Sequence, residues 1–357
     1  MDEAVLERIV RRYRDVETYI LRLIADAAQE EQLDMMVLYQ NQHRQIRMIL
    51  SQADAHLRLL EEGIAQDVID AVIGGYTDGM VAAASSVPGA PVPAMVPTAS
   101  VEALAAEAVT AVVSQRTAIL RSTEDIYRSL TEMMSARAMV TGTPYSRILQ
   151  TSLNEYADRG ITGFIDKAGR RWGIDSYAEM AVRTANNRAH NQGRKDQYRE
   201  LGVELVLTSW HRASAPQCIP YQGKILALSG PAGPRQVQDR STGEWITVEV
   251  TATLDEAIEN GYHHPNCAHF DQAYIPGMPI PKVPNVRPEE HEAAQRQRAI
   301  ERHIRKWKKR EVVAITPEER GKAKRHIRAW EKAQSEHVGR HEFLTRRRER
   351  EEIRQAT

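Results

Sequence analysis

The stretch VELVLTSW, from Val203 to Trp210, contains the clearest β-strand pattern of this sequence. It is rich in residues that favour strands, and Gly202 and the loop sequence HRASAPQC bound it. GKILALSG and the alternating EWITVEVTATL predict further strands, and LDEAIENG predicts a short helix that ends at Gly261. We therefore expect a central α+β domain with a small mixed or antiparallel sheet.

Helical patterns extend from this domain in both directions, so the fold is expected to be mostly α. On the N-terminal side, apolar residues recur every three or four positions, which places them on one face of a helix. The first such series is Ile9, Tyr13, Val16, Ile20, Leu23 and Ala27, and the second is Ile46, Ile49, Ala53, Leu57 and Leu60. A third helix is expected over 65–84, weakened by Gly74 and Gly75. Either an ordinary bundle or a docking coiled coil fits this pattern.

The segment SSVPGAPVPAMVPTAS, from Ser85 to Ser100, contains four prolines and no charged residue. This composition is typical of a linker that is partly polyproline II. The sequence therefore predicts five parts: a helical bundle or coiled coil over 1–84, the linker over 85–100, a helical segment over 101–157, the α+β core over 158–282, and a basic helical region over 283–357.

The basic region contains an internal repeat, RHIRKWKK at 302–309 and RHIRAWEK at 325–332. Each copy places its Ile and Trp three residues apart, on one helix face. Between the copies, Thr316 followed by Pro317 and Glu319 predicts a helix start. We therefore expect a C-terminal helical hairpin. From Val283 onward there are 21 Lys and Arg against 13 Asp and Glu, although the whole chain has no net charge.

An excess of positive charge on a helical hairpin favours a polyanionic or acidic partner. Nine side chains are candidate contacts to DNA phosphates: Lys306, Lys308, Lys309, Arg310, Lys324, Arg325, Arg346, Arg347 and Arg348. Such contacts are non-specific and weaken strongly with salt. The alternative is that these charges only solvate the hairpin and pair with Glu301, Glu311 and Glu331 within each helix.

The stretch GYHHPNCAHF, from Gly261 to Phe270, combines three histidines with one of the two cysteines. Zinc prefers such nitrogen and sulfur ligands in a tetrahedral arrangement. The second cysteine, Cys218, lies in the loop that follows the strand VELVLTSW, and a hairpin would bring that loop beside Cys267. The predicted ligand set is Cys218, His264, Cys267 and His269, with His263 or His211 as substitutes.

Three other interpretations of the same residues stay open. The cysteines can form a disulfide, or pack as small apolar side chains beside a His-Pro-Asn turn. They can also form the centre of a zinc-dependent enzyme or toxin. The sequence has no P-loop, no G-x-G-x-x-G after a strand, no H-E-x-x-H and no G-x-S-x-G. We therefore expect a protein that is not an enzyme.

The N-terminus, MDEAVLERIV, is acidic and helical in pattern, unlike a signal peptide. We find no uninterrupted apolar run of membrane-spanning length. These features predict a protein made in the cytoplasm that does not contact a membrane.

Five pieces of the sequence, in order, resemble the tailed-bacteriophage minor capsid protein 2 family, a relative of the Mu F-like head morphogenesis proteins. They are GITGFIDKAGRRW, YAEMAVRTANNRAHNQG, SAPQCIPYQGKILALSG, LDEAIENGYHHPNCAHF and YIPG, which together cover 160–277. The basic stretch AAQRQRAIERHIRKWKKR is similar to a helix of that family. Two features depart from it: Ala268 stands where Arg is usual, and 231–253 is an insertion that is expected to form an added hairpin.

The resemblance implies a structural head protein of the virion, present in few copies near the portal vertex or on the capsid interior. On this interpretation the chain contacts the portal protein, the major capsid protein or other copies of itself. The basic tail, because of its own charge, is expected to face packaged DNA or an acidic capsid lining. The resemblance implies neither catalysis nor a cofactor, so zinc remains a hypothesis from the residues alone. A nucleic-acid-binding adaptor without a virion role is a further alternative.

Overall fold

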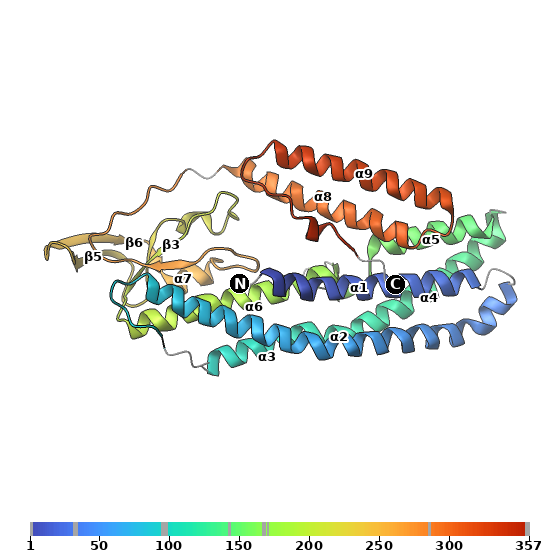
Figure 1. Cartoon of the computed structure of the whole chain (residues 1–357), viewed down its shortest axis with the longest axis horizontal. Coiled ribbons are helices and arrows are strands. Elements are labelled where there is room, and N and C mark those ends of the chain that lie inside the picture. The colour runs from blue at the N-terminus through green and yellow to red at the C-terminus, as the bar shows by residue number, and fades with distance from the viewer. Residues whose placement is uncertain are drawn as a thin grey trace. The chain divides into compact units, whose positions relative to one another are not determined.

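The computed structural model describes residues 3–30, 35–93, 99–141, 144–165, 169, 171–284 and 287–353. The fold is mostly helical with a small mixed sheet, as predicted (Figure 1). It contains two compact units. Unit 1 comprises Met1–Glu3, Val68–Val109 and Met180–Ala294, and unit 2 comprises Ala4–Asp67, Thr110–Glu179 and Gln295–Thr357. Part of the predicted linker, 94–98, lies outside the described residues.

The helices account for most of the described chain. They are α1 (Glu3–Glu30), α2 (Met35–Ser85), α3 (Ala99–Val113), α4 (Gln115–Thr141), α5 (Tyr145–Arg159), α6 (Ile174–Glu200), α7 (Leu254–Glu259), α8 (Pro288–Val312) and α9 (Pro317–Gly339), with short 3-10 turns η1 (Ile219–Tyr221) and η2 (Arg348–Arg350). The boundary between the units falls inside α2, α3, α6 and α8.

The predicted apolar faces of α1 and α2 are buried, with one exception. Leu23 is only half-buried, whereas the other members of both series are buried. The prediction of a separate helix over 65–84 is wrong. These residues continue α2, which runs without a break through Gly74 and Gly75. The reason lies in unit 1, where a β-carbon at Gly79 would collide with the carbonyl oxygen of His190, and one at Gly193 with that of Tyr76. Glycine is thus a contact residue in these helices, not a helix end.

The sheet of unit 1 has the order β7-β4-β3-β8. Its strands are β3 (Leu205–Thr208), β4 (Ile225–Ala227), β7 (Ala252–Thr253) and β8 (Asp271–Ala273). β3 is antiparallel to β4 and β8, and β4 is parallel to β7. The insertion forms the hairpin expected for it, β5 (Gly233–Gln238) against β6 (Trp245–Val250). In unit 2, β1 (Thr162–Ile165) pairs with β2 (Arg171–Gly173).

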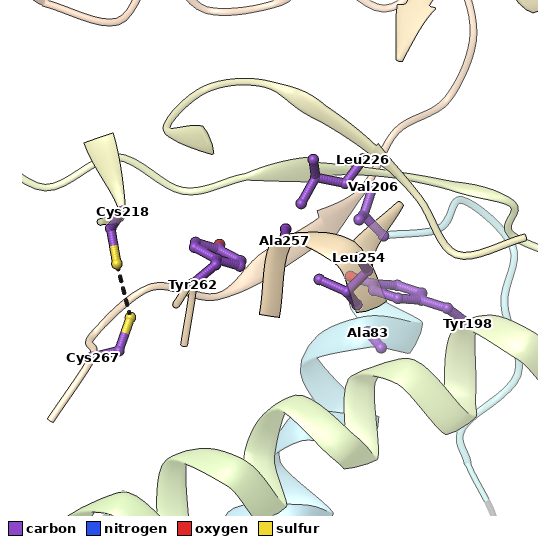
Figure 2. Packing of buried hydrophobic residues seen from close by; sticks show 9 residues of the cluster. All are labelled: Ala83, Tyr198, Val206, Cys218, Leu226, Leu254, Ala257, Tyr262 and Cys267. Atoms are coloured by element: carbon purple, nitrogen blue, oxygen red, sulfur yellow. Dashed lines mark hydrogen bonds between the residues drawn. The ribbon is translucent and has the colours of Figure 1, made fainter. Parts of the chain in front are cut away.

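Both faces of the central strands are covered, which explains their nearly continuous apolar sequence. On one face, Val206 and Leu226 pack with Tyr198, Leu254 and Tyr262 (Figure 2). On the other face, the remaining core residues pack together: Leu205, Ile225, Ala227, Val248, Val250 and Tyr274. The cluster of the first face also contains Cys218 and Cys267, so the core extends directly to the candidate site.

The C-terminal hairpin is confirmed as α8 and α9, which run side by side (Figure 1). The two copies of the repeat meet reciprocally, because Trp307 stacks on His326 and His303 stacks on Trp330, with ring centroids 3.8 and 4.3 Å apart. Thr316 caps α9 through its side chain, which accepts a hydrogen bond from the backbone of Glu319. The predicted helix start is confirmed, because α9 begins at Pro317 with Thr316 as its N-cap.

One stretch of the described residues, Ala99–Met134, is long and apolar enough by length and composition to cross a membrane, with a mean hydropathy of 1.2. It contains no uninterrupted apolar run of membrane-spanning length, as expected from the sequence. Scattered alanines and valines raise the mean without forming such a run. This stretch also makes polar contacts in unit 2: the hydroxyl of Tyr13 donates to the carbonyl of Val112 over 3.0 Å, and Arg116 pairs with Asp54 and Glu61.

Candidate functional site

The register of the sheet brings together two loops that are distant in the sequence. Thr208, at the end of β3, pairs with Asp271, at the start of β8. The backbone N–H of Ser209 then donates to the carbonyl of Phe270 over 2.9 Å. The loop after β3, which we call the cysteine loop (209–224), therefore lies beside the loop before β8, the histidine loop (260–270).

These two loops bring Cys218 and Cys267 face to face (Figure 2). Their sulfur atoms lie 3.8 Å apart, and both residues are buried free thiols. A ring nitrogen of His264 lies near both sulfur atoms, and these three atoms are all within 4.8 Å of one another. His269, the fourth residue of the predicted set, has Nδ1 at 3.3 Å from the Cys267 sulfur. All four predicted ligands thus lie around Cys267.

The substitute ligands named from the sequence occupy different places. His263 Nδ1 lies 4.0 Å from the Cys267 sulfur, and its Nε2 contacts the Asp271 carboxylate at 2.9 Å. His211 Nε2 lies 2.8 Å from the carbonyl of Ala268, and its ring meets that of His269 edge-on. His263 therefore faces the cluster, whereas His211 supports it from outside.

Burial and hydrogen bonding shift the pKa values within the cluster. Burial alone would lower the pKa of His263, but its hydrogen bonds with Asp271 and Cys267 outweigh this and raise it to about 9. The contact with Cys218, followed by those with His263 and His269, lowers the pKa of the Cys267 thiol. The same contact with Cys267 raises the pKa of Cys218. Cys267 is thus the sulfur whose thiolate form the site favours.

A pocket of about 570 Å³ opens beside the cluster. Its lining includes His263, His264, Cys267 and Asp271, and Asn187 and Asn191 of α6. All six residues belong to unit 1. Asn187 donates to the carbonyl of Cys267 over 2.5 Å, and the side chain of Asn191 contacts His263 Nδ1 at 3.2 Å. Chemically, the arrangement offers soft sulfur and imidazole ligands for a metal, next to space for a small molecule.

Sequence reasoning missed three residues that support this cluster: Asp271, Asn191 and Gln222. The spacing of Asn187 and Asn191, one turn apart on α6, was a usable signal, since it places two amides on one helix face. Asp271 and Gln222 carry no such signal. Their roles follow only from the pairing of β3 with β8 and from the fold of the cysteine loop.

Five of the nine candidate phosphate contacts are paired with carboxylates of unit 2. Lys306 and Arg310 both contact Asp158, at 3.0 and 2.6 Å. Lys309 pairs with Glu17 at 2.6 Å, Lys324 with Glu311 at 3.7 Å, and Arg346 with Glu351 at 2.6 Å. These basic side chains are therefore partly neutralised by carboxylates within unit 2, and only some of them point to solvent.

The other four candidates differ in exposure. Arg325 and Arg348 are exposed, and Lys308 and Arg347 are half-buried. Lys324 is exposed despite its partner. Of the carboxylates expected to pair within a helix, Glu301 does so, with Arg298 at 3.4 Å, whereas Glu311 reaches from α8 to α9.

The chain is similar to proteins of phage particles. The family model for phage minor capsid protein 2 matches residues 2–339. A protein of Lactococcus phage LL-H, described as a structural protein, is 27% identical over 195 residues, which are 50% of this chain and 48% of that protein. The chain therefore spans about half the length of this relative. No solved structure matches the chain. Because the family match covers nearly the whole chain, this protein belongs to the phage minor capsid protein 2 family and has a structural role in a phage particle.

Proposed function

We propose that this protein is a low-copy component of the phage head, located at the portal vertex or on the capsid interior, where it contacts portal or major capsid subunits. The observation that carries the proposal is the family match over 2–339, which includes the helical regions and the basic hairpin as well as the α+β core. A match of this extent supports a role in the head that involves the whole chain. The relative from a Lactococcus phage, described as a structural protein, supports a structural role.

Cross-linking of intact virions, followed by mass spectrometry, tests this location. We expect lysines of this chain to cross-link to the portal protein or to the inner face of the major capsid protein, and the chain to be far less abundant than the major capsid protein. Cross-links confined to tail proteins, or a copy number equal to that of the major capsid protein, would contradict the proposal. Heads purified without tails provide the control, since they should retain the chain.

We further propose that α9 contacts packaged DNA. Arg325, Arg328 and Lys332 are exposed and recur at intervals of three and four residues, so they share one face of α9. Within the described part of the chain, no carboxylate lies within ion-pairing distance of Arg325 or Arg328, and Lys332 reaches Glu336 only at 3.8 Å. An exposed pair of this kind stabilises little, so these charges are available for phosphates.

Binding of the full chain to double-stranded DNA at several salt concentrations tests this contact. Replacing Arg325, Arg328 and Lys332 by Ala should weaken binding and reduce the slope of log affinity against log salt by about 3, since each lost phosphate contact contributes about 0.9. The matched control replaces three exposed arginines of α2, Arg44, Arg47 and Arg58, and should leave the slope unchanged. Equal effects of both triple substitutions would refute a specific role for α9.

A further inference from the structure

We propose that the cysteine loop and the histidine loop bind one zinc ion, with Cys218, His264, Cys267 and His269 as its four ligands. This inference does not depend on the role in the phage head. It rests on the separation of the ligand atoms, on the conformation of the histidine loop and on the hydrogen bonds that prepare each ligand.

The separations match a tetrahedral zinc site. With Zn–S bonds of about 2.3 Å and tetrahedral angles, two sulfur ligands lie about 3.8 Å apart, and sulfur and nitrogen ligands about 3.5 Å apart. The Cys218 and Cys267 sulfurs are separated by 3.8 Å, and the Cys267 sulfur and His269 Nδ1 by 3.3 Å. A disulfide would require about 2.05 Å. The ligand atoms of Cys218, His264 and Cys267 all lie within 4.8 Å of one another, close enough to bind one metal ion.

The backbone of the histidine loop is shaped to present His264 and Cys267 side by side. The N–H of Cys267 donates to the carbonyl of His264 over 2.8 Å, with Pro265 and Asn266 at the central positions. Asn266 has a φ of 64°, as the third residue of a type II turn requires. His263 has a φ of 56°, and among the described residues these are the two non-glycine residues with positive φ. Backbone strain of this kind concentrates at functional sites, and here it flanks two ligands.

Hydrogen bonds leave a lone pair on each histidine for the metal. His264 Nδ1 lies 2.7 Å from the carbonyl of Pro265 and donates its proton there, so the second ring nitrogen is the ligand. His269 Nε2 lies 3.1 Å from Gln222 Oε1, which also accepts from Ser214 and from the backbone of His211. Nε2 of His269 is therefore a donor, and the lone pair is on Nδ1, which faces Cys267. Partners of this kind fix the tautomer of zinc-bound histidines.

The Cys267 sulfur receives a backbone hydrogen bond. The N–H of His269 donates to the Cys267 sulfur over 3.4 Å. Donors of this kind stabilise thiolates, the form in which cysteine binds zinc. His269 Nδ1 lies outside the group of three whose atoms are mutually within 4.8 Å, so as the fourth ligand it would have to move closer to the other ligand atoms when the metal binds. The result is a closed structural site that ties the two loops together.

The test uses the untagged full-length chain, purified without chelator and measured for zinc and reactive thiols. We expect one zinc per chain, with both thiols protected in the native protein and both reactive after denaturation with chelator. Zinc removal followed by cobalt titration should give thiolate-to-cobalt charge-transfer absorption, and X-ray absorption should show two sulfur and two nitrogen ligands. No metal uptake by the stripped wild-type chain, a disulfide, or fewer than two sulfur ligands would overturn the proposal.

Single substitutions identify the ligands. Cys218→Ser, Cys267→Ser, His264→Ala and His269→Ala should each weaken zinc binding at least tenfold, whereas His291→Ala, which removes a histidine outside the cluster, should not. The wild-type cobalt titration remains decisive if a variant fails to fold. A His269→Ala variant with wild-type zinc affinity would refute the assignment of the fourth ligand.

Discussion

At the scale of single residues, the basic C-terminal region contributes charges to the interior of unit 2. Glu17 on α1 is fully buried, and it pairs with Lys309 on α8 at 2.6 Å and accepts a hydrogen bond from the backbone of Ile161 over 3.0 Å. Asp175 is also buried and pairs with Arg14 at 3.3 Å and Arg305 at 3.5 Å. Burial of a charge is tolerated only with such partners, so these contacts specify how α8 packs in unit 2.

Removing the partner of Glu17 should therefore destabilise the protein. We expect Lys309→Ala to reduce the free energy of unfolding by about 3–5 kcal/mol, because it leaves a buried carboxylate without its counter-charge. Urea denaturation followed by circular dichroism measures this. The control is Lys332→Ala, whose side chain is 79% exposed and whose loss should change stability by less than about 0.5 kcal/mol. Similar effects of the two substitutions would show that the ion pair contributes little.

Asp175 should make the protein sensitive to acid. Burial alone would raise its pKa, but the charges of Arg305, Lys309 and Arg14 outweigh burial and hold the pKa well below its usual range. Because the pKa is lower in the folded state, the stabilisation is complete above the unfolded pKa of about 3.9 and is lost as the pH falls below it. We expect the stability difference between the wild type and Asp175→Asn, measured by urea denaturation, to shrink from pH 7 to pH 3. A pH-independent difference would exclude this linkage.

At the scale of elements, the repeat in the basic region produces a hairpin with nearly two-fold internal symmetry. The His of each copy stacks on the Trp of the other, and Ile304 and Ile327 are buried. Only an antiparallel arrangement lets two copies that share the same His and Trp positions exchange contacts in this way. The repeated residues therefore form the contact between α8 and α9.

The two stacks should contribute about equally. A double-mutant cycle of Trp307→Ala with His326→Ala, measured by urea denaturation, should give a coupling energy of about 1 kcal/mol, as should His303→Ala with Trp330→Ala. Trp307→Ala combined with Arg328→Ala, an exposed residue of α9, should be additive and provides the control. A coupling in only one of the two pairs would argue against the symmetric hairpin.

The glycines of α2 and α6 permit close helix packing within unit 1. Gly79→Ala and Gly193→Ala should each destabilise the protein by about 1–3 kcal/mol or more, because the new methyl groups meet backbone atoms that cannot move freely. Gly74→Ala is the matched control, since nothing lies within 4 Å of its β-carbon position. It should stabilise α2 by up to about 1 kcal/mol through helix propensity. Thermal melts of the three variants distinguish these outcomes.

At the scale of the whole molecule, each unit is assembled from three separate chain segments. The basic hairpin joins unit 2 through α8, which buries Ile300 and Ile304 and supplies the partners of Glu17, Asp158 and Asp175. The segment before α8 is different: it is extended, and Met278 and Ile280 are about half exposed. We therefore expect the packing of α8, and not the continuity of the chain across this segment, to hold the hairpin in unit 2.

A nick in this segment should leave the molecule associated. We expect that a site for a specific protease, inserted after Met278, can be cleaved in the native protein. The C-terminal fragment should co-elute with the rest on size exclusion at physiological salt, because the buried contacts of α8 persist, and should separate in urea. Release of the fragment without denaturant would show that the hairpin is held by chain connection alone, and the uncut insertion variant is the control.

The sequence by itself determined the local features of this protein. Periodic apolar residues predicted the buried faces of α1 and α2, the repeat predicted the hairpin of α8 and α9, and the insertion was recognised as β5 and β6. These features depend on neighbours within a few residues along the chain, so their patterns are readable without a fold. The same is true of the turn from His264 to Cys267, where proline and asparagine specify the backbone.

Only the tertiary structure decided how distant residues meet. Cys218 and Cys267 are 49 positions apart, and they face each other because β3 pairs with β8. Asp271 and Gln222 support the histidines for the same reason, and Lys309 of α8 lies against Glu17 of α1 because the fold of unit 2 brings the two helices together. A single charged side chain has the same local sequence whether it faces solvent or a buried carboxylate. Its role depends on burial and partners, which arise only when segments remote in the chain are brought together.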